Sequence, residues 1–194
     1  MDKSNFPYGE KTNFELQNIG SNSLNVLEKK KCKLILIGCN TLSCVLENNS
    51  NINIIKINEC IIDEVKRKIK KGRVLVLCTK LTKKSGFFQL ELNKLHLDYD
   101  VVSVKEFVNM VENNSININK IKEKLSPYLN IKYDAVILGC THFYYLEEYI
   151  KELFMKSKII HGFNNMEKKV KRFLKKNNLK NHSLNSGNIV VVRN

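Results

Sequence analysis

The sequence predicts an α/β fold with two lobes, in which mainly parallel sheets are flanked by helices. Runs of aliphatic residues typical of buried strands alternate with helix-like segments along the chain. Two of these runs, 33–37 and 134–138, end in the same Gly-Cys-polar step. The chain has 194 residues, 43% of them hydrophobic, which is enough for a core in one domain or in two small lobes.

Hydrophobic periodicity and the residues that begin or end helices predict where the helices and strands lie. Thr12 is a good N-cap for the first helix, and Gly72 ends a later one. We expect helices at 12–30, 41–47, 59–70, 81–92, 105–112, 118–125, 143–154 and 165–176. We expect strands at 33–37, 53–57, 73–78, 99–104, 134–138, 158–161 and 188–192.

This order of elements suggests how the chain divides. Residues 1–75 are expected to form part of a first α/β lobe, and residues 76–160 a second lobe. The C-terminal helix and strand, 161–194, are expected to return to the first lobe.

The net charge is +14, and it comes almost wholly from lysine. Such a charge attracts nucleic acid or anionic lipid, yet no aromatic residues are interleaved with the basic ones as in binding motifs. We therefore expect no nucleic-acid partner, although the charge can concentrate an anionic substrate. No stretch approaches the roughly 20 apolar residues that span a bilayer, and residues 1–20 do not resemble a signal peptide. The expectation is a cytoplasmic protein without a membrane partner.

The six cysteines do not follow metal-ligand or disulfide spacing, so we expect reduced thiols and no metal. Neither GxGxxG nor GxxxxGK[ST] occurs, which gives nucleotide binding no support. Free cysteine often only fills core space, and this is our interpretation of four of the six. These four are Cys32, Cys44, Cys60 and Cys78.

Cys39 and Cys140 are different, because each follows a strand and a glycine. The carboxyl ends of parallel strands are where open α/β sheets bind ligands, so both thiols can face one cleft. Two opposed thiols suit the transfer of a proton from one face of a carbon to the other. A following helix N-terminus would lower each thiol pKa from about 8.5 and would favour a substrate carboxylate. Hydrogen-bonding side chains stand beside each thiol: Asn40, Thr41, Thr141 and His142.

Four motifs in order resemble those of glutamate racemases, in the aspartate/glutamate racemase superfamily. They are Asp2…Pro7-Tyr8-Gly9, Gly38-Cys39-Asn40-Thr41, Thr79-x-x-Thr82-x-x-Ser85-Gly86 and Leu138-Gly139-Cys140-Thr141-His142. Each motif is weak alone, whereas four in this order over most of the chain form a specific signal.

The resemblance implies racemisation of glutamate by two bases without a cofactor, with Cys39 and Cys140 as the catalytic residues. It also implies that the D-glutamate formed feeds peptidoglycan synthesis in the bacterial cell wall, and it leaves a homodimer open. The implied substrate-binding residues are Pro7, Tyr8, Gly9, Asn40, Thr41, Thr79, Thr82, Thr141 and His142. Two points stay open: Thr79 and Thr82 could instead cap the next helix, and His142 could bind substrate or relay a proton to Cys140.

The sequence departs from the family pattern in two places, which keeps alternative functions open. Family members begin with a strand, an Asp-Ser-Gly-x-Gly-Gly loop and a helix, so we expect this first strand–helix unit to be absent and a strand edge to be unpaired. Residues 159–162 read Ile-Ile-His-Gly where the family has a strand ending in Asp-Ser. An inactive family member, a basic nucleic-acid-associated protein and an enzyme acting on aspartate therefore remain alternatives.

Overall fold

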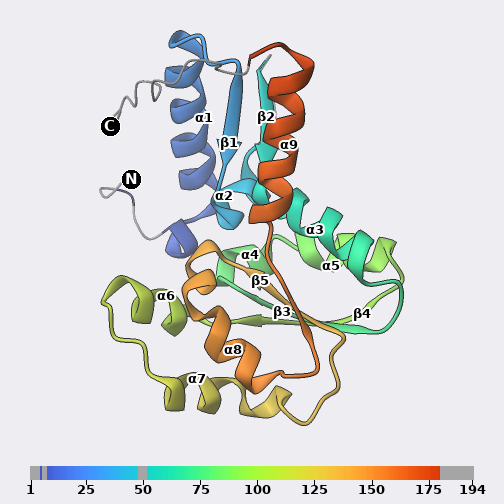
Figure 1. Cartoon of the computed structure of the whole chain (residues 1–194). Coiled ribbons are helices and arrows are strands. Elements are labelled where there is room, and N and C mark those ends of the chain that lie inside the picture. The colour runs from blue at the N-terminus through green and yellow to red at the C-terminus, as the bar shows by residue number, and fades with distance from the viewer. Residues whose placement is uncertain (1–4, 6–7, 48–51, 180–194) are drawn as a thin grey trace.

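The computed structural model describes residues 5, 8–47 and 52–179, and within them the strands form two separate parallel sheets (Figure 1). The strands are β1 (Leu34–Ile37), β2 (Asn53–Lys56), β3 (Arg73–Cys78), β4 (Asp98–Ser103), β5 (Ala135–Gly139) and β6 (Lys158–Ile160). The α/β class with parallel sheets is confirmed. The strand expected at 188–192 lies outside the described residues.

Helices alternate with these strands, as expected. The α-helices are α1 (Asn13–Lys29), α2 (Asn40–Val45), α3 (Ile57–Lys68), α4 (Lys80–Lys84), α5 (Phe87–Lys94), α6 (Lys105–Glu112), α7 (Ile118–Leu125), α8 (Glu147–Leu153) and α9 (Phe163–Lys176). The 3-10 helices are η1 (Tyr8–Glu10), η2 (Ser126–Tyr128) and η3 (Thr141–Leu146). Thr12 caps α1 as expected: its hydroxyl accepts from the Glu15 N–H at 3.2 Å, and the Glu15 carboxylate accepts from the Thr12 N–H.

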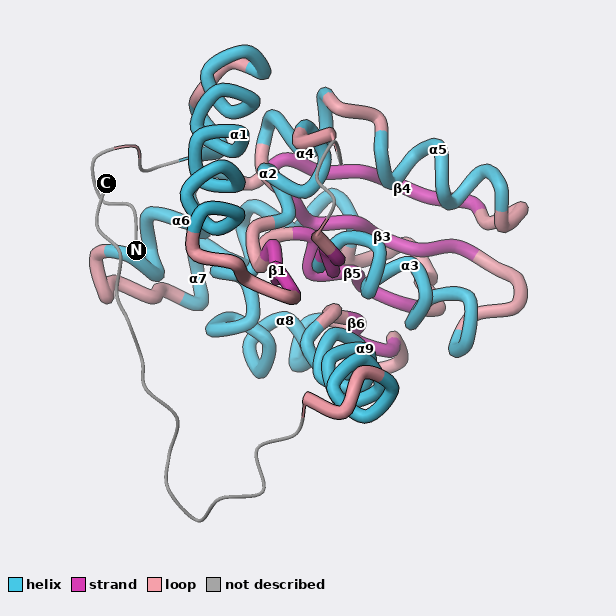
Figure 2. The backbone as a smooth tube through the Cα atoms, turned by 90° about the horizontal axis from the view of Figure 1, so that it is seen from above, coloured by secondary structure: helices cyan, strands magenta, loops and turns pink. Residues whose placement is uncertain are grey.

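The smaller sheet pairs β1 with β2 and lies between α1 and α9 (Figures 1 and 2). Its core includes Leu24 of α1, Ile35 and Ile37 of β1, and Leu46. At Gly20, a Cβ atom would lie 2.7 Å from the end of the Leu46 side chain, so a larger residue there would force this side chain to move.

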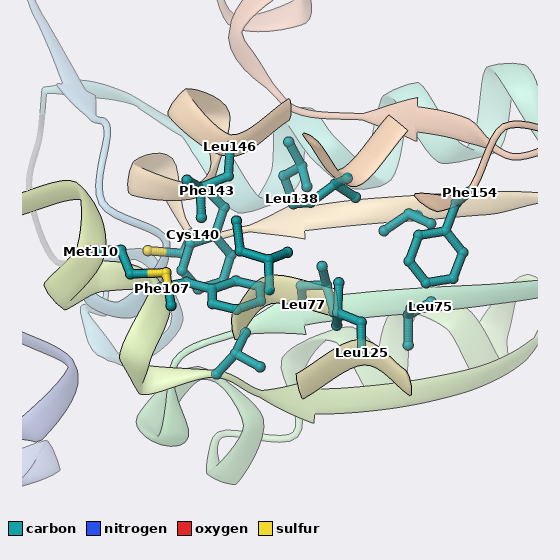
Figure 3. Packing of buried hydrophobic residues seen from close by; sticks show 14 of the residues in the cluster. Leu75, Leu77, Phe107, Met110, Leu125, Leu138, Cys140, Phe143, Leu146 and Phe154 are labelled. Atoms are coloured by element: carbon teal, nitrogen blue, oxygen red, sulfur yellow. The ribbon is translucent and has the colours of Figure 1, made fainter. Parts of the chain in front are cut away.

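The larger sheet has the order β4-β3-β5-β6 and is covered on both faces. Side chains alternate along β3: Val74 and Val76 pack toward α3 and α5, whereas Leu75 and Leu77 pack toward α6, α7 and α8 (Figure 3). Burying each such side chain stabilises the fold by about 1.5–3 kcal/mol relative to exposure.

The two sheets are joined by α3 and α9. Helix α3 packs on the larger sheet through Ile61 and Val65 and also contacts α9, which contacts β2 of the smaller sheet. At Gly162, just before α9, a Cβ atom would lie 2.7 Å from the carbonyl oxygen of Ile57, so this junction is tightly packed. The division of the chain at residues 75 and 160 stays a prediction.

Two expected helices differ in the structure. The segment 81–92 is broken into α4 and α5 because Gly86 adopts a positive φ of 73°, a conformation that glycine accepts readily. The segment after Cys140 begins as η3 and becomes α8 only at Glu147. A 3-10 turn of three residues directs both Phe143 and Leu146 into the core.

No helix in the described ranges is long and apolar enough to cross a membrane.

Candidate active site

A pocket of about 820 Å³ lies where the two sheets meet at their carboxyl ends. Cys39, which follows β1 of the smaller sheet, lines this pocket together with Cys140, which follows β5 of the larger sheet. The structure therefore brings together the two thiols that are 101 positions apart (140 − 39) in the sequence.

Cys39 is the N-cap residue of α2. Its sulfur accepts a hydrogen bond from the backbone N–H of Leu42 at 3.5 Å. The backbone and hydroxyl of Thr41 also interact with it and favour the thiolate form. These donors are the ones expected at the start of a helix.

Cys140 is the N-cap residue of η3 and stands beside an imidazole. Its sulfur lies 3.7 Å from Nδ1 of His142, and Nε2 of the same ring lies 2.5 Å from Oε1 of Glu112 at the end of α6. The chain of contacts from sulfur through imidazole to carboxylate can pass a proton or hold charge near Cys140.

The thiols do not have the lowered pKa values that the sequence suggested. Burial raises the pKa of Cys39 and raises the pKa of Cys140 to about 12. Backbone N–H groups act in the expected direction on both thiols, and the charge of Cys39 further raises the pKa of Cys140. The expectation was wrong because desolvation of a buried thiolate outweighs a few hydrogen bonds.

Three threonine hydroxyls form a buried cluster between α2 and α4. The oxygens of Thr41 and Thr79 are 3.0 Å apart, those of Thr79 and Thr82 are 3.0 Å apart, and those of Thr82 and Thr41 are 3.2 Å apart. Thr79 also caps α4, accepting from the Thr82 N–H at 3.3 Å. Thr41 and Thr79 line the pocket, whereas Thr82 lies behind them and is fully buried.

Asn40 has an unusual environment for a buried amide. Its side chain lines the pocket and is only 2% exposed, yet neither amide atom has a hydrogen-bond partner among the described residues. A buried unpaired polar group costs about 1–3 kcal/mol, and both atoms of this amide are free to hydrogen-bond a molecule in the pocket.

The remaining predicted site residues can now be located. Tyr8, Gly9, Thr141 and His142 all line the pocket. A Cβ atom at Gly9 would lie 3.0 Å from Cβ of Thr79, so a side chain there would press on the pocket wall. Pro7 lies outside the described residues.

Sequence reasoning missed several polar residues of this site. Lysine and glutamate side chains from other segments line the pocket: Glu10, Lys11, Lys80, Lys84 and Lys105. It also missed Glu112, the partner of His142. The only signal for Lys80 and Lys84 was their position inside the Thr79–Gly86 motif, where surface lysines are also common. Among the described residues, no group of three or more His, Cys, Asp or Glu is arranged to hold a metal ion.

Comparison with known proteins identifies the family. The sequence profile of the Asp/Glu/Hydantoin racemase family matches residues 2–164. The chain belongs to this family. It is 30% identical to glutamate racemase of Clostridium perfringens strain 13 over 202 residues, which cover 98% of this chain and 77% of that protein. It is 29% identical to glutamate racemase of Clostridium botulinum strain Kyoto, covering 98% of this chain and 78% of that protein.

Solved structures of the family have the same fold. The structure of glutamate racemase from Francisella tularensis in complex with D-glutamate superposes with a TM-score of 0.81 at 26% identity, over 94% of this chain and 72% of that one. The structure of glutamate racemase from Campylobacter jejuni gives a TM-score of 0.78 at 25% identity, over 93% and 76% of the two chains. The family and fold inferred from the motifs are confirmed.

Proposed function

We propose that this protein is a glutamate racemase that interconverts L- and D-glutamate with two thiols and no cofactor. The observation that carries the proposal is the shared pocket: Cys39 and Cys140 reach it from matched strand–Gly–Cys turns of different sheets. The choice of glutamate as the substrate is supported by the relatives named glutamate racemase, which are 29–30% identical to this chain. The D-glutamate formed serves peptidoglycan synthesis.

The proposed reaction needs one thiolate and one thiol in each direction. The thiolate takes the α-proton of glutamate, and the electron pair of that C–H bond remains on the α-carbon and its carboxylate. The opposite thiol then donates its proton to the other face of the carbon. Each turnover leaves the two sulfurs with exchanged protonation states, and the reverse reaction restores them.

The raised pKa values of the two thiols affect both the strength of each thiolate as a base and the amount of it at neutral pH. A thiolate of raised pKa is a stronger base toward an α-proton, but it is rare at neutral pH without a cation beside it. The α-ammonium group of glutamate brings such a charge into the pocket. Binding of substrate would thus help to create the base that attacks it.

Neutral polar groups in the pocket wall would hold the α-carboxylate and α-ammonium. Asn40 has both a donor and an acceptor without partners among the described residues. The hydroxyls of Thr41, Thr79 and Thr141 lie on the same wall. His142 would deliver or remove a proton at Cys140, with Glu112 fixing its ring.

We further propose that the protein works in the cytoplasm, where its free thiols stay reduced. Its partner would be the free amino acid, with neither nucleic acid nor membrane involved. Assembly as a homodimer stays a prediction, which light scattering on the purified protein tests.

The proposal is tested by incubation of the purified protein with L-glutamate in deuterium oxide. We expect loss of the α-hydrogen signal by NMR together with D-glutamate by chiral chromatography. Cys39→Ser and Cys140→Ser should each abolish racemisation, whereas Cys32→Ser, outside the pocket, should retain it. A folded wild-type protein that produces no D-glutamate would refute the proposal, and a fully active Cys39→Ser variant would refute the two-thiol mechanism.

A further inference from the structure

A histidine that does not line the pocket follows β6 and is enclosed by side chains of three elements. The centroid of the His161 ring lies 5.1 Å from that of Tyr144 in η3 and 5.5 Å from that of Phe163 in α9. Its Nε2 atom lies 3.7 Å from the carboxylate of Glu147, where α8 begins. Only 17% of the His161 side chain is exposed. His161 therefore links η3, α8 and α9.

Packing, and not hydrogen bonding, accounts for the position of this ring. Nδ1 of His161 is buried and has no hydrogen-bond partner in the part of the chain that the structure describes. The contact of Nε2 with Glu147 is longer than the roughly 2.7–3.2 Å of a hydrogen bond. Tyr144 and Phe163 also contact each other, with ring centroids 5.1 Å apart, so the three rings form a closed triangle. Two of the three contacts are edge-to-face, a geometry that adds to the stabilisation from burial.

The contacts of this ring fall on one face of η3. Side chains three residues apart eclipse each other in a 3-10 helix. The N–H of Glu147 donates a hydrogen bond to the Tyr144 carbonyl, so this spacing extends to Glu147. Thr141, Tyr144 and Glu147 therefore share a face, and Thr141 at its start lines the pocket. A second face carries Phe143 and Leu146 into the core (Figure 3). Core packing thus holds one face of η3, and the imidazole holds another that reaches the pocket.

The backbone on either side of His161 is buried, so the ring stands on a fixed support. Ile160 is fully buried and lies opposite Ile137 of β5. Gly162 packs so closely that a Cβ atom there would lie 2.7 Å from the Ile57 carbonyl oxygen. From this point α9 runs alongside β2 of the smaller sheet (Figure 1). The imidazole therefore connects η3 to the junction between the two sheets.

We infer that His161 is a positioning residue: through Tyr144 and Glu147 it holds the face of η3 that presents Thr141 to the pocket. The inference rests on the proposed function, in which the Thr141 hydroxyl helps to hold the substrate beside Cys140. The imidazole does not line the pocket, so it acts through η3 and not on the substrate. A shift of η3 would move the α-carbon relative to the Cys140 thiol, and a misplacement of about 1 Å can cost on the order of 100-fold in rate.

The test replaces the ring and compares the variant with a second histidine. His161→Asn removes the ring contacts, whereas His161→Phe keeps a ring without its nitrogens. We expect His161→Asn to lower kcat/KM for glutamate racemisation about tenfold, and His161→Phe to stay within about threefold of the wild type. The control is His96→Asn, because His96 is exposed in the turn after α5 and asparagine tolerates its positive φ of 54°. The control should stay within about twofold of the wild type. Unfolding midpoints check that all the variants are folded.

Alkylation by iodoacetamide gives a second readout, which needs no racemase activity. Burial is the largest influence on the pKa of Cys140 and outweighs the N–H groups of η3. A loosened η3 in His161→Asn should therefore accelerate alkylation of Cys140 at least about threefold at about pH 8, as followed by peptide mass spectrometry. Cys39 precedes α2 and should react at an unchanged rate.

The outcomes separate the inference from the proposed function. Equal acceleration at both cysteines, or an unchanged rate at Cys140, would overturn the positioning role of His161. Unchanged racemisation in His161→Asn, or equal losses in His161→Asn and His161→Phe, would also overturn it. Selective acceleration at Cys140 in a protein that forms no D-glutamate would support the positioning role and refute the proposed racemase activity.

Discussion

The imidazole of His142 joins Cys140 of one strand end to Glu112 of a neighbouring helix, with Nε2 2.5 Å from the Glu112 carboxylate. A carboxylate on the far nitrogen fixes the orientation of the ring. We therefore expect Glu112→Gln to lower kcat for glutamate racemisation by about 10–100-fold with little change in KM.

The matched control for this variant is Glu106→Gln. Glu106 lies on the same helix, and its carboxylate is 2.6 Å from Lys124 on α7, outside the pocket lining. Steady-state rates in both directions should change less than about twofold in this control. Equal rates for the two variants would show that Glu112 has no role in positioning His142.

The raised pKa of the Cys140 thiol predicts a slow, strongly pH-dependent reaction with iodoacetamide in the absence of substrate. Only the thiolate reacts, and burial raises the Cys140 pKa to about 12. Alkylation should therefore accelerate about tenfold for each pH unit between pH 7 and 10, as followed by peptide mass spectrometry. A plateau near pH 9 would mean that the thiol has the ordinary pKa of about 8.5.

The same groups make the folded protein sensitive to alkali. Burial raises the pKa of Cys78 and of Cys140 to about 12, so both thiols stay protonated in the folded chain where they ionise in the unfolded one. Their contribution is fully present below the unfolded pKa of about 8.5 and is lost as the pH rises toward 12. The urea concentration at the unfolding midpoint should decrease as the pH is raised from about 8.5 to about 10. The decrease should be less steep in Cys140→Ser.

Two glycines in equivalent motif positions should respond differently to alanine. At Gly139 a Cβ atom would lie 3.0 Å from the Leu77 carbonyl oxygen and 3.1 Å from the Phe88 ring, whereas at Gly38 it would meet nothing within 4 Å. Gly139→Ala should lower the free energy of unfolding by about 1–3 kcal/mol, and Gly38→Ala by less than about 1 kcal/mol. Urea denaturation of both variants measures the difference, and equal losses would contradict this difference in packing.

Two threonines of the buried cluster are expected to differ in their effects on substrate binding and on stability. Thr82 is buried behind the pocket wall, so Thr82→Val should cost about 1–2 kcal/mol of stability and leave KM nearly unchanged. Thr79 caps α4 and also lines the pocket, so Thr79→Val should lower stability and raise KM together. Unfolding curves combined with KM values decide between the two roles. A raised KM in Thr82→Val would assign that hydroxyl to the substrate.

Most of the fold could be predicted because its signals are local. The strand before Cys140 is a run of aliphatic residues that are all buried in the sheet, and Thr12 caps α1 as its sequence position suggests. The break at Gly86 could not be predicted, since glycine is also tolerated inside helices and only its positive φ decides.

The site could be predicted only where it depends on local motifs and not on contacts made in the assembled fold. Cys39 and Cys140 stand in short motifs that are visible in the sequence, and the pocket contains both. The pairing of His142 with Glu112 depends on where α6 ends relative to β5, which no local pattern encodes. The direction of the thiol pKa shifts depends on burial, which is a property of the assembled fold.

Each thiol follows a strand of a different sheet, so neither sheet alone fixes the distance between the two sulfur atoms. It depends on the contacts that join the sheets: those among α3, α9 and β2, the close approach of Gly162 to Ile57, and the hydroxyl cluster between α2 and α4. Each sheet positions one thiol, whereas the contacts between the sheets position the two thiols relative to each other. A substitution at these contacts would therefore change the geometry of both thiols at once without replacing either of them.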